Sequence, residues 1–194
     1  KIKYNGTTAV TRQGVLPEES AEAGKEYSIE ELLRLMVVHS DNASYEALEA
    51  FIRNEPQRIQ LRHDTFQEIG FIDPKDQVEG TVSVRGYSSL FRLLYNVSFL
   101  DAEYSEKLLG WLASSVYHDG LVAGVPPGVL VAHKFGERLM PDGVKQLSDC
   151  GIVYYPGNPY LICIMARGDS WENLTKTIVE ISRHMYEEVD SRRI

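Results

Sequence analysis

The chain has 194 residues, of which 43% are hydrophobic and 25% are charged, and its formal net charge is -8 with a pI near 5.2. This composition is typical of a soluble globular protein with one domain, or with two small lobes that share a core. The negative charge disfavours a nucleic-acid partner, and no apolar run approaches the roughly 20 residues that span a bilayer.

After an extended arm or strand and a polar loop, the first half of the chain is predicted to be helical. Residues 1–10 mix apolar and β-branched side chains and indicate a strand or an extended arm, whereas residues 11–27 are polar and indicate a loop. Ser28 and Glu31 make a capping box, which predicts a helix over residues 29–38. The apolar face of this helix comprises Ile29, Leu32, Leu33, Met36 and Val37.

Further helices are predicted along the same half. One covers residues 43–53 and stops before Pro56, and residues 57–85 are polar and predicted to be irregular. Ser83 and Asp101 are typical N-caps for two more helices. The inward side chains of these helices are expected to be Leu48, Phe51, Ile52, Leu90, Leu93, Leu94, Leu108, Leu109 and Leu112.

The second half changes to strands. Residues 129–132 form a short apolar β run, and residues 152–155 and 160–165 form an antiparallel pair joined by a tight turn. Ser170 caps a last helix, whose apolar face is expected to comprise Leu174, Ile178, Ile181 and Met185. Helices followed by strands and a closing helix are typical of an α+β fold with an antiparallel sheet covered by a helix.

The two cysteines, Cys150 and Cys163, flank the predicted hairpin and lie nearly opposite each other across its strands. A disulfide is geometrically feasible there. Without a sign of an oxidising compartment, the sequence favours two buried free thiols.

Ser40, Asp41 and Asn42 lie between the first two predicted helices. A hydroxyl, a carboxylate and an amide can converge at such a place without belonging to either apolar face. Ser, Asp and Asn are also the preferred N-cap residues, so an ordinary helix cap explains the triplet when it is taken alone.

Lys134, Phe135 and Gly136 end the first β run. A lysine at the end of a buried strand can project its ammonium into a cleft, while the glycine lets a ligand approach the backbone closely. Taken alone, a solvated lysine followed by a turn glycine explains this pattern better.

The two triplets in this order make the chain resemble the penicillin-recognising serine hydrolases, most closely the class A β-lactamase branch. That family carries S-x-x-K, then S-D-N, then K-T-G. Here S-D-N is intact at residues 40–42, and K-T-G corresponds to residues 134–136. The flanking segments also fit, namely residues 27–33, 120–128 and 149–154.

The resemblance implies a β-lactamase/transpeptidase-like α+β fold, with a helical lobe beside an antiparallel sheet flanked by helices and a cleft between them. Residues 1–127 would form the mostly helical lobe, and residues 128–194 the strands and C-terminal helix of the α/β lobe, all as one structural unit. The N-terminal strands and the nucleophile helix of the family would be missing.

The family's chemistry is acyl transfer by an activated serine. The resemblance implies that Ser40 relays a proton to the departing nitrogen of the substrate. Lys134 would lie close to Ser40, hold its hydroxyl in position and add positive potential for the substrate carboxylate.

The resemblance also implies a set of substrate-binding groups. Asn42 would hydrogen-bond the substrate's side-chain amide, and the backbone N–H of Glu137 would contribute to the oxyanion hole. Phe135 and Gly136 would line the same wall, and Asp41 would mainly hold the loop. Phe135 replaces the threonine whose hydroxyl helps to bind a carboxylate, which predicts altered or weakened substrate binding.

Two motifs of the family are absent. No serine in the chain is followed three residues later by lysine, so the nucleophile is expected outside these 194 residues. The chain starts at Lys1 without a signal peptide, and we expect a truncated or processed product. The loop in which the family carries a deacylating Glu followed by an Asn is also lacking, because no asparagine lies between Asn54 and Asn96. The acids of that region are expected to be solvated loop charges: Glu68, Asp73, Asp76 and Glu79.

These departures leave three functions open. The first is a serine β-lactamase-like hydrolase of β-lactams, and the second is a D-alanyl-D-alanine carboxypeptidase or penicillin-binding protein, which dispenses with the deacylating glutamate. The third is a non-catalytic relative that binds peptidoglycan or a protein partner. The family implies a periplasmic or cell-envelope location and no cofactor, and the histidines are too scattered for a metal site. A missing N-terminal segment of the same protein is a further candidate partner.

Overall fold

The computed structural model of the protein describes residues 1–6, 14–71 and 82–192. Its elements in chain order are β1 (Ile2–Lys3), β2 (Glu26–Tyr27), α1 (Ile29–Val38), α2 (Asn42–Arg53), α3 (Pro56–Glu68), α4 (Val84–Tyr95), α5 (Ala102–Ala113), the 3₁₀ helix η1 (Leu121–Gly124), β3 (Val131–Leu139), β4 (Lys145–Val153), β5 (Tyr160–Gly168) and α6 (Trp171–Ser191). None of the described helices is long and apolar enough to cross a bilayer.

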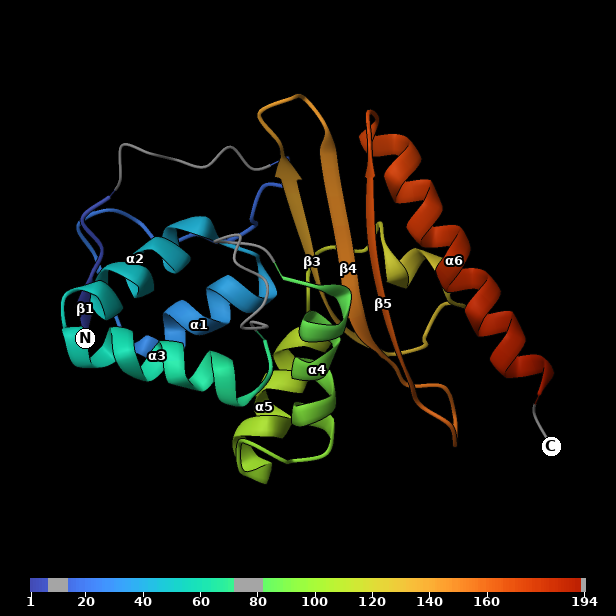
Figure 1. Ribbon diagram of the computed structural model, residues 1–194, viewed down its shortest axis with the longest axis horizontal. Coiled ribbons are helices and arrows are strands. Elements are labelled where there is room, and N and C mark those ends of the chain that lie inside the picture. The colour runs from blue at the N-terminus through green and yellow to red at the C-terminus, as the bar shows by residue number, and fades with distance from the viewer. Residues whose placement is uncertain (7–13, 72–81, 193–194) are drawn as a thin grey trace.

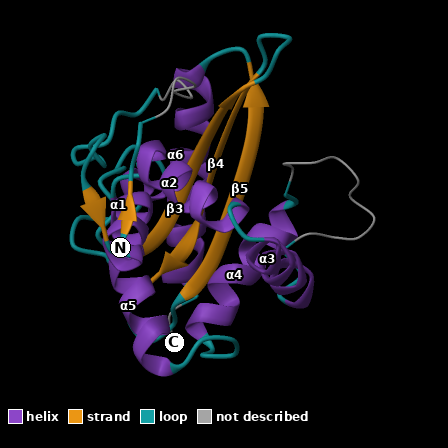
Figure 2. Cartoon of the chain, turned by 90° about the vertical axis from the view of Figure 1, so that its left-hand side faces the viewer, coloured by secondary structure: helices purple, strands orange, loops and turns teal. Residues whose placement is uncertain are grey.

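An antiparallel sheet with strand order β3-β4-β5 divides the molecule into two layers of helices. In Figure 1, α6 covers one face of the sheet, α4 and α5 lie against the other face, and α1 to α3 extend beyond β3. Figure 2 shows the three long strands side by side, with the short pair β1–β2 set apart from them. This arrangement confirms the predicted α+β fold.

Each face of the sheet buries its own core. The core shared with α1, α4 and α5 comprises Val37, Phe91, Leu112, Ala132, Cys150 and Ile152. The core shared with η1 and α6 comprises Leu121, Val131, Leu147, Val153, Leu174 and Ile178. Since alternate side chains of a strand share a face, Lys134 lies on the same face as Ala132, which packs against α1, α4 and α5.

The predicted helix starts are confirmed where a side chain caps the helix. Ser28 accepts a hydrogen bond from the backbone of Glu31, whose carboxylate accepts one from Ser28 in return, so the capping box is complete. Ser83, Asp101 and Ser170 likewise accept backbone hydrogen bonds at the starts of α4, α5 and α6. These caps depend on contacts within four residues, which the sequence contains in full.

The predicted strands are too short. β3 continues to Leu139, so Lys134 lies in the middle of this strand and the prediction that it ends the strand is wrong. β4 begins at Lys145, so it includes a polar first half that was not predicted as strand. Two of the polar side chains of this half, Ser148 and Asp149, are buried. At the N-terminus only β1 forms among residues 1–6, and it pairs with β2 inside the predicted loop. The remainder of the predicted arm, residues 7–10, lies outside the described residues.

The prediction of an irregular chain after residue 56 is wrong for α3. Pro56 occupies the first turn of this helix, where its missing N–H removes no hydrogen bond. None of its side chains is buried, so the helix lacks the apolar face that would reveal it. Contacts with α2 hold it instead: the guanidinium of Arg58 lies 3.8 Å from the centre of the Phe51 ring, and Arg62 pairs with Glu49.

The buried face of α6 also differs from the prediction. Leu174 and Ile178 are buried as expected, but Ile181 and Met185 are 43% and 40% exposed. The third buried position is Ser182, whose hydroxyl donates to the carbonyl of Leu121 at 2.8 Å. The Ser182 hydroxyl thus gives the carbonyl of the first residue of η1 a hydrogen-bond donor. A strictly apolar pattern cannot indicate such a buried polar position.

Cys150 and Cys163 are directly paired across β4 and β5 and form a disulfide, so the prediction of two free thiols is wrong. The prediction of free thiols depends on the redox compartment of the protein, and composition alone does not reveal that compartment.

Replacing both cysteines by alanine is expected to lower the free energy of unfolding by about 3 kcal/mol, because the cross-link restricts the unfolded chain. Urea unfolding with and without a thiol reductant measures this loss. Reductant should destabilise the wild type and leave the double variant unchanged. Two titratable thiols in the untreated wild type, together with no effect of reductant, would contradict the disulfide.

Candidate active site

Ser40 occupies the corner between α1 and α2. It has φ 55°, in the left-handed region that few residues other than glycine adopt. This conformation turns the chain sharply between two helices, so that Ser40 belongs to neither. Such local strain is often retained at functional positions.

Asp41 fixes this corner. Its carboxylate accepts hydrogen bonds from the backbone N–H groups of Ala43 and Ser44, which makes it the N-cap of α2. It also accepts from the hydroxyls of Ser20 and Ser44 at 2.6 and 2.5 Å and from the N–H of Ala21 at 3.0 Å. Burial raises the pKa of Asp41, but these hydrogen bonds outweigh it and hold the pKa below its ordinary value.

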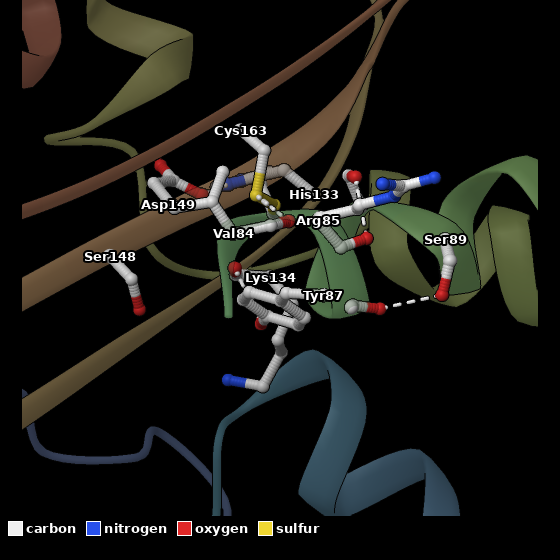
Figure 3. The surroundings of a disulfide bond; sticks show 12 residues. Val84, Arg85, Tyr87, Ser89, His133, Lys134, Ser148, Asp149 and Cys163 are labelled. Atoms are coloured by element: carbon white, nitrogen blue, oxygen red, sulfur yellow. Dashed lines mark hydrogen bonds and ion pairs between the residues drawn. A yellow bond between two sulfur atoms is a disulfide. The ribbon is translucent and has the colours of Figure 1, made fainter. Parts of the chain in front are cut away.

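Lys134 reaches Ser40 from the sheet. Its Nζ donates to Ser40 Oγ at 2.6 Å and to the carbonyl of Phe135 at 3.1 Å. Burial lowers the pKa of Lys134 to about 8, although the carboxylates of Asp149 and Glu137 act in the opposite direction. Near neutral pH this amine can therefore exchange a proton with a neighbouring hydroxyl. Figure 3 shows the Lys134 side chain leaving β3 toward the helices, beside Tyr87.

The edge of β3 that faces away from β4 presents backbone groups beside Ser40 and Lys134. Cys150 and Cys163 have Cα atoms 4.0 Å apart, which is typical of a non-hydrogen-bonded antiparallel pair. Cys150 therefore directs its backbone groups to its other partner, Lys134 of β3. By alternation, Phe135 and Glu137 direct their N–H and C=O groups away from β4, and the hydrogen bond from Lys134 to the Phe135 carbonyl agrees. The N–H of Glu137 thus points away from β4, on the same edge of β3 as the Phe135 carbonyl.

Phe135 does not present its ring as an open wall. It is 4% exposed and stacks on Tyr117 with ring centres 4.0 Å apart. Its ring centre lies 4.5 Å from Lys134 Nζ, so it supports the ammonium by a cation–π contact. Gly136 lies on the face of β3 opposite to Phe135, and the hydroxyl of Ser148 donates to the Gly136 carbonyl at 3.2 Å. A cavity of about 180 Å³ borders Gly136, Glu137 and Ser148.

The structure thus brings Ser40, Lys134 and the Glu137 backbone to one place, and Asn42 follows as the first residue of α2. The roles of these residues in substrate binding stay predictions. Glu68, at the end of α3, is exposed, whereas Asp73, Asp76 and Glu79 lie outside the described residues.

Behind Lys134 lies a buried polar pair that no sequence pattern predicts. His133 Nδ1 lies 2.8 Å from Asp149 Oδ1, and both residues are almost fully buried. The second carboxylate oxygen accepts the N–H of Leu121 at 2.9 Å. A Cβ on Gly120 would collide with this carboxylate, which explains the glycine. Two buried polar residues at alternate positions of adjacent strands give no apolar pattern, and only their shared burial reveals them.

Tyr87 of α4 was also missed. Its hydroxyl donates to the carbonyl of Lys134 at 2.9 Å, and burial raises its pKa. It therefore acts as a neutral donor that fixes the lysine backbone. Among the described residues, no three His, Cys, Asp or Glu side chains cluster closely enough to hold a metal ion.

A sequence model of the β-lactamase enzyme family matches residues 1–189. The chain belongs to the β-lactamase enzyme family. This β-lactamase-family chain has no significant match among curated proteins. Its structural neighbours nevertheless confirm the β-lactamase-like serine hydrolase fold that the two motifs predicted.

Three solved structures illustrate the likeness. A structure of PBP-A is 21% identical, with a TM-score of 0.69, and the match covers 88% of this chain and 64% of that one. A β-lactamase from Sphaerobacter thermophilus DSM 20745 is 16% identical, with a TM-score of 0.69 and coverage of 90% and 68%. The class A β-lactamase from Mycobacterium abscessus is 19% identical, with a TM-score of 0.67 and coverage of 84% and 66%. The chain therefore spans about two thirds of the length of these β-lactamase-fold proteins.

Proposed function

We propose that this chain carries part of the active site of a serine acyl-transfer hydrolase, which acts on β-lactams or D-Ala-D-Ala peptides. The observation that carries the proposal is the 2.6 Å hydrogen bond between Lys134 Nζ and Ser40 Oγ, which joins two residues 94 positions apart. A related structure, a PBP-A variant, is described as an acyl-enzyme complex with penicillin G, which supports the substrate class.

The proposed chemistry follows from the geometry. Lys134, with its pKa near 8, donates a hydrogen bond to Ser40 and adds positive potential for a substrate carboxylate. Ser40 then passes a proton to the departing nitrogen. The outward N–H of Glu137 is one oxyanion donor, and Asn42 hydrogen-bonds the acyl side-chain amide. The attacking serine, which no S-x-x-K motif supplies here, comes from outside these residues.

A carboxypeptidase or penicillin-binding protein is the second candidate. The missing glutamate–asparagine loop motif favours it, because slow deacylation leaves a stable acyl-enzyme. A non-catalytic peptidoglycan- or partner-binding relative is the third candidate, supported by the loss of the threonine hydroxyl at Phe135. For either enzyme we propose a cell-envelope or periplasmic location, where β-lactams and peptidoglycan peptides occur.

Incubation with a fluorescent penicillin, followed by intact-mass measurement, tests the proposal. The 194-residue chain alone should form no covalent adduct, because it lacks the nucleophile. An adduct on this chain would show that the nucleophile is one of its own residues and would contradict the assignment.

The same assay separates the three candidates when it is applied to a longer polypeptide that includes any residues encoded upstream of Lys1. A stable adduct supports the peptidase, and rapid turnover supports the β-lactamase. No adduct and no turnover on the longer protein would rule out both enzymes and leave the binding protein.

A further inference from the structure

Residues 14–21 form a strap that contacts both walls of the candidate site. At one end, Oε1 of Glu137 accepts the backbone N–H groups of Gly14 at 2.5 Å and Val15 at 3.0 Å. A single carboxylate oxygen thus holds two successive amides, which are charge-assisted hydrogen bonds. Glu137 belongs to β3, so this end of the strap is fixed to the sheet.

The other end of the strap is fixed to the helical lobe. Ser20 Oγ and the Ala21 N–H both donate to Asp41, at 2.6 and 3.0 Å. Glu19 pairs with Arg34 of α1 at 2.7 Å, and its carboxylate lies 3.6 Å from the buried ring of His39. In Figure 1 the blue loop that follows the grey trace runs from the end of β3 back to the helices.

The two ends of the strap flank Ser40 and Lys134. Asp41 follows Ser40 in the chain, and Glu137 lies three residues after Lys134. The hydrogen bond between Ser40 and Lys134 therefore closes a ring of contacts that runs through Glu137, the strap and Asp41. We propose that Glu137 is a positioning residue, whose side chain holds the strap and thereby fixes Ser40 relative to β3. This role is separate from the backbone N–H of Glu137 and rests on the proposed function only for what Ser40 does.

Gly14 is fitted to this contact. A Cβ at this position would lie 2.7 Å from Oε2 of Glu137, which is closer than real Cβ atoms approach. The glycine is not in the left-handed region, so its backbone alone does not exclude alanine. An alanine there would displace the carboxylate at the end of the flexible Glu137 side chain from its contact with the strap, which makes the pair suitable for a double-mutant cycle.

Hydrogen-exchange NMR on the ¹⁵N-labelled chain tests the proposal without any ligand. In Glu137→Ala, amide exchange should rise at least tenfold at Val15 and at least threefold at Ala21, at the far end of the strap. Glu137→Gln keeps one acceptor oxygen, so exchange at both amides should stay within about threefold of the wild type. Glu106→Ala, an exposed change on α5, is the matched control and should leave both amides unchanged.

An unchanged Ala21 amide in Glu137→Ala would overturn the proposal, as would exchange as fast in Glu137→Gln as in Glu137→Ala. Gly14→Ala should speed Ala21 exchange in the wild-type background and add nothing in the Glu137→Ala background. Additive effects would also overturn it. Because no β-lactam enters these measurements, a failure of the strap and a failure of the proposed function are distinguishable.

Discussion

Replacing Lys134 by methionine is expected to raise the free energy of unfolding at pH 7 by about 1–3 kcal/mol. The folded protein holds the Lys134 ammonium at a pKa of about 8, against 10.5 for an ordinary lysine, because burial removes its water. At pH 7 this charge destabilises the folded state, even after the hydrogen bonds to Ser40 and Phe135 are counted. Methionine keeps the aliphatic length and carries no charge.

The pH dependence gives a sharper test of the same residue. The folded state releases the Lys134 proton near pH 8, while the unfolded chain keeps it until about pH 10.5. Wild-type stability should therefore rise by roughly 2 kcal/mol between pH 7 and 9.5, and Lys134→Met should lack this rise. The window ends at 9.5 because tyrosines of the unfolded chain ionise near pH 10.

Urea unfolding at several pH values measures both effects. Lys176→Met, which removes an exposed lysine of α6, is the matched control and should retain the wild-type slope. A destabilised Lys134→Met variant with an unchanged slope would show that the lysine is an ordinary solvated cation. A stabilised variant that lacks the rise with pH would instead identify a buried charge that the fold retains at a cost in stability.

The sequence predicted the parts of the fold that depend on near neighbours. The Ser28 capping box and the Ser83 and Asp101 caps involve residues within four positions, and all three are confirmed. The helix α3 was missed because its stabilising contacts, such as Arg58 with Phe51, are polar or aromatic contacts with α2. The polar first half of β4 was missed because burial of Asp149 depends on His133, 16 residues away.

The candidate site divides in the same way. Ser40 and Lys134 could be paired from sequence only because a family pattern supplies the spacing, and the structure places them 2.6 Å apart. The contact between Gly14 and Glu137 spans 123 residues and lies in no motif. A long-range contact between a backbone amide and a carboxylate leaves no periodic signal, so it could be found only from coordinates.

Asp41 carries the second large expected effect. Its carboxylate accepts five hydrogen bonds, which come from Ser20, Ala21, Ala43 and Ser44, the last through both its N–H and its hydroxyl. Asp41→Ala should lower the free energy of unfolding by about 3–5 kcal/mol, because several buried donors lose their acceptor together. Asp41→Asn keeps one acceptor oxygen and should show a smaller loss, of about 1–3 kcal/mol.

Asp101 provides the matched control, because it also caps a helix but does so at the surface, through the N–H of Tyr104. Asp101→Ala should cost about 1 kcal/mol, the usual value of an N-cap.

Since the pKa of Asp41 is lowered in the folded state, its contribution to stability is complete above the ordinary carboxyl pKa and is lost as pH falls through the folded value. Acid should therefore reduce the difference between wild type and Asp41→Ala. An Asp41→Ala loss no larger than that of Asp101→Ala would show that Asp41 is only a helix cap. A larger loss, accompanied by faster exchange at the Ala21 amide, would show that the residue after Ser40 also anchors the strap, and that the Ser40 corner and residues 14–21 fold as one unit.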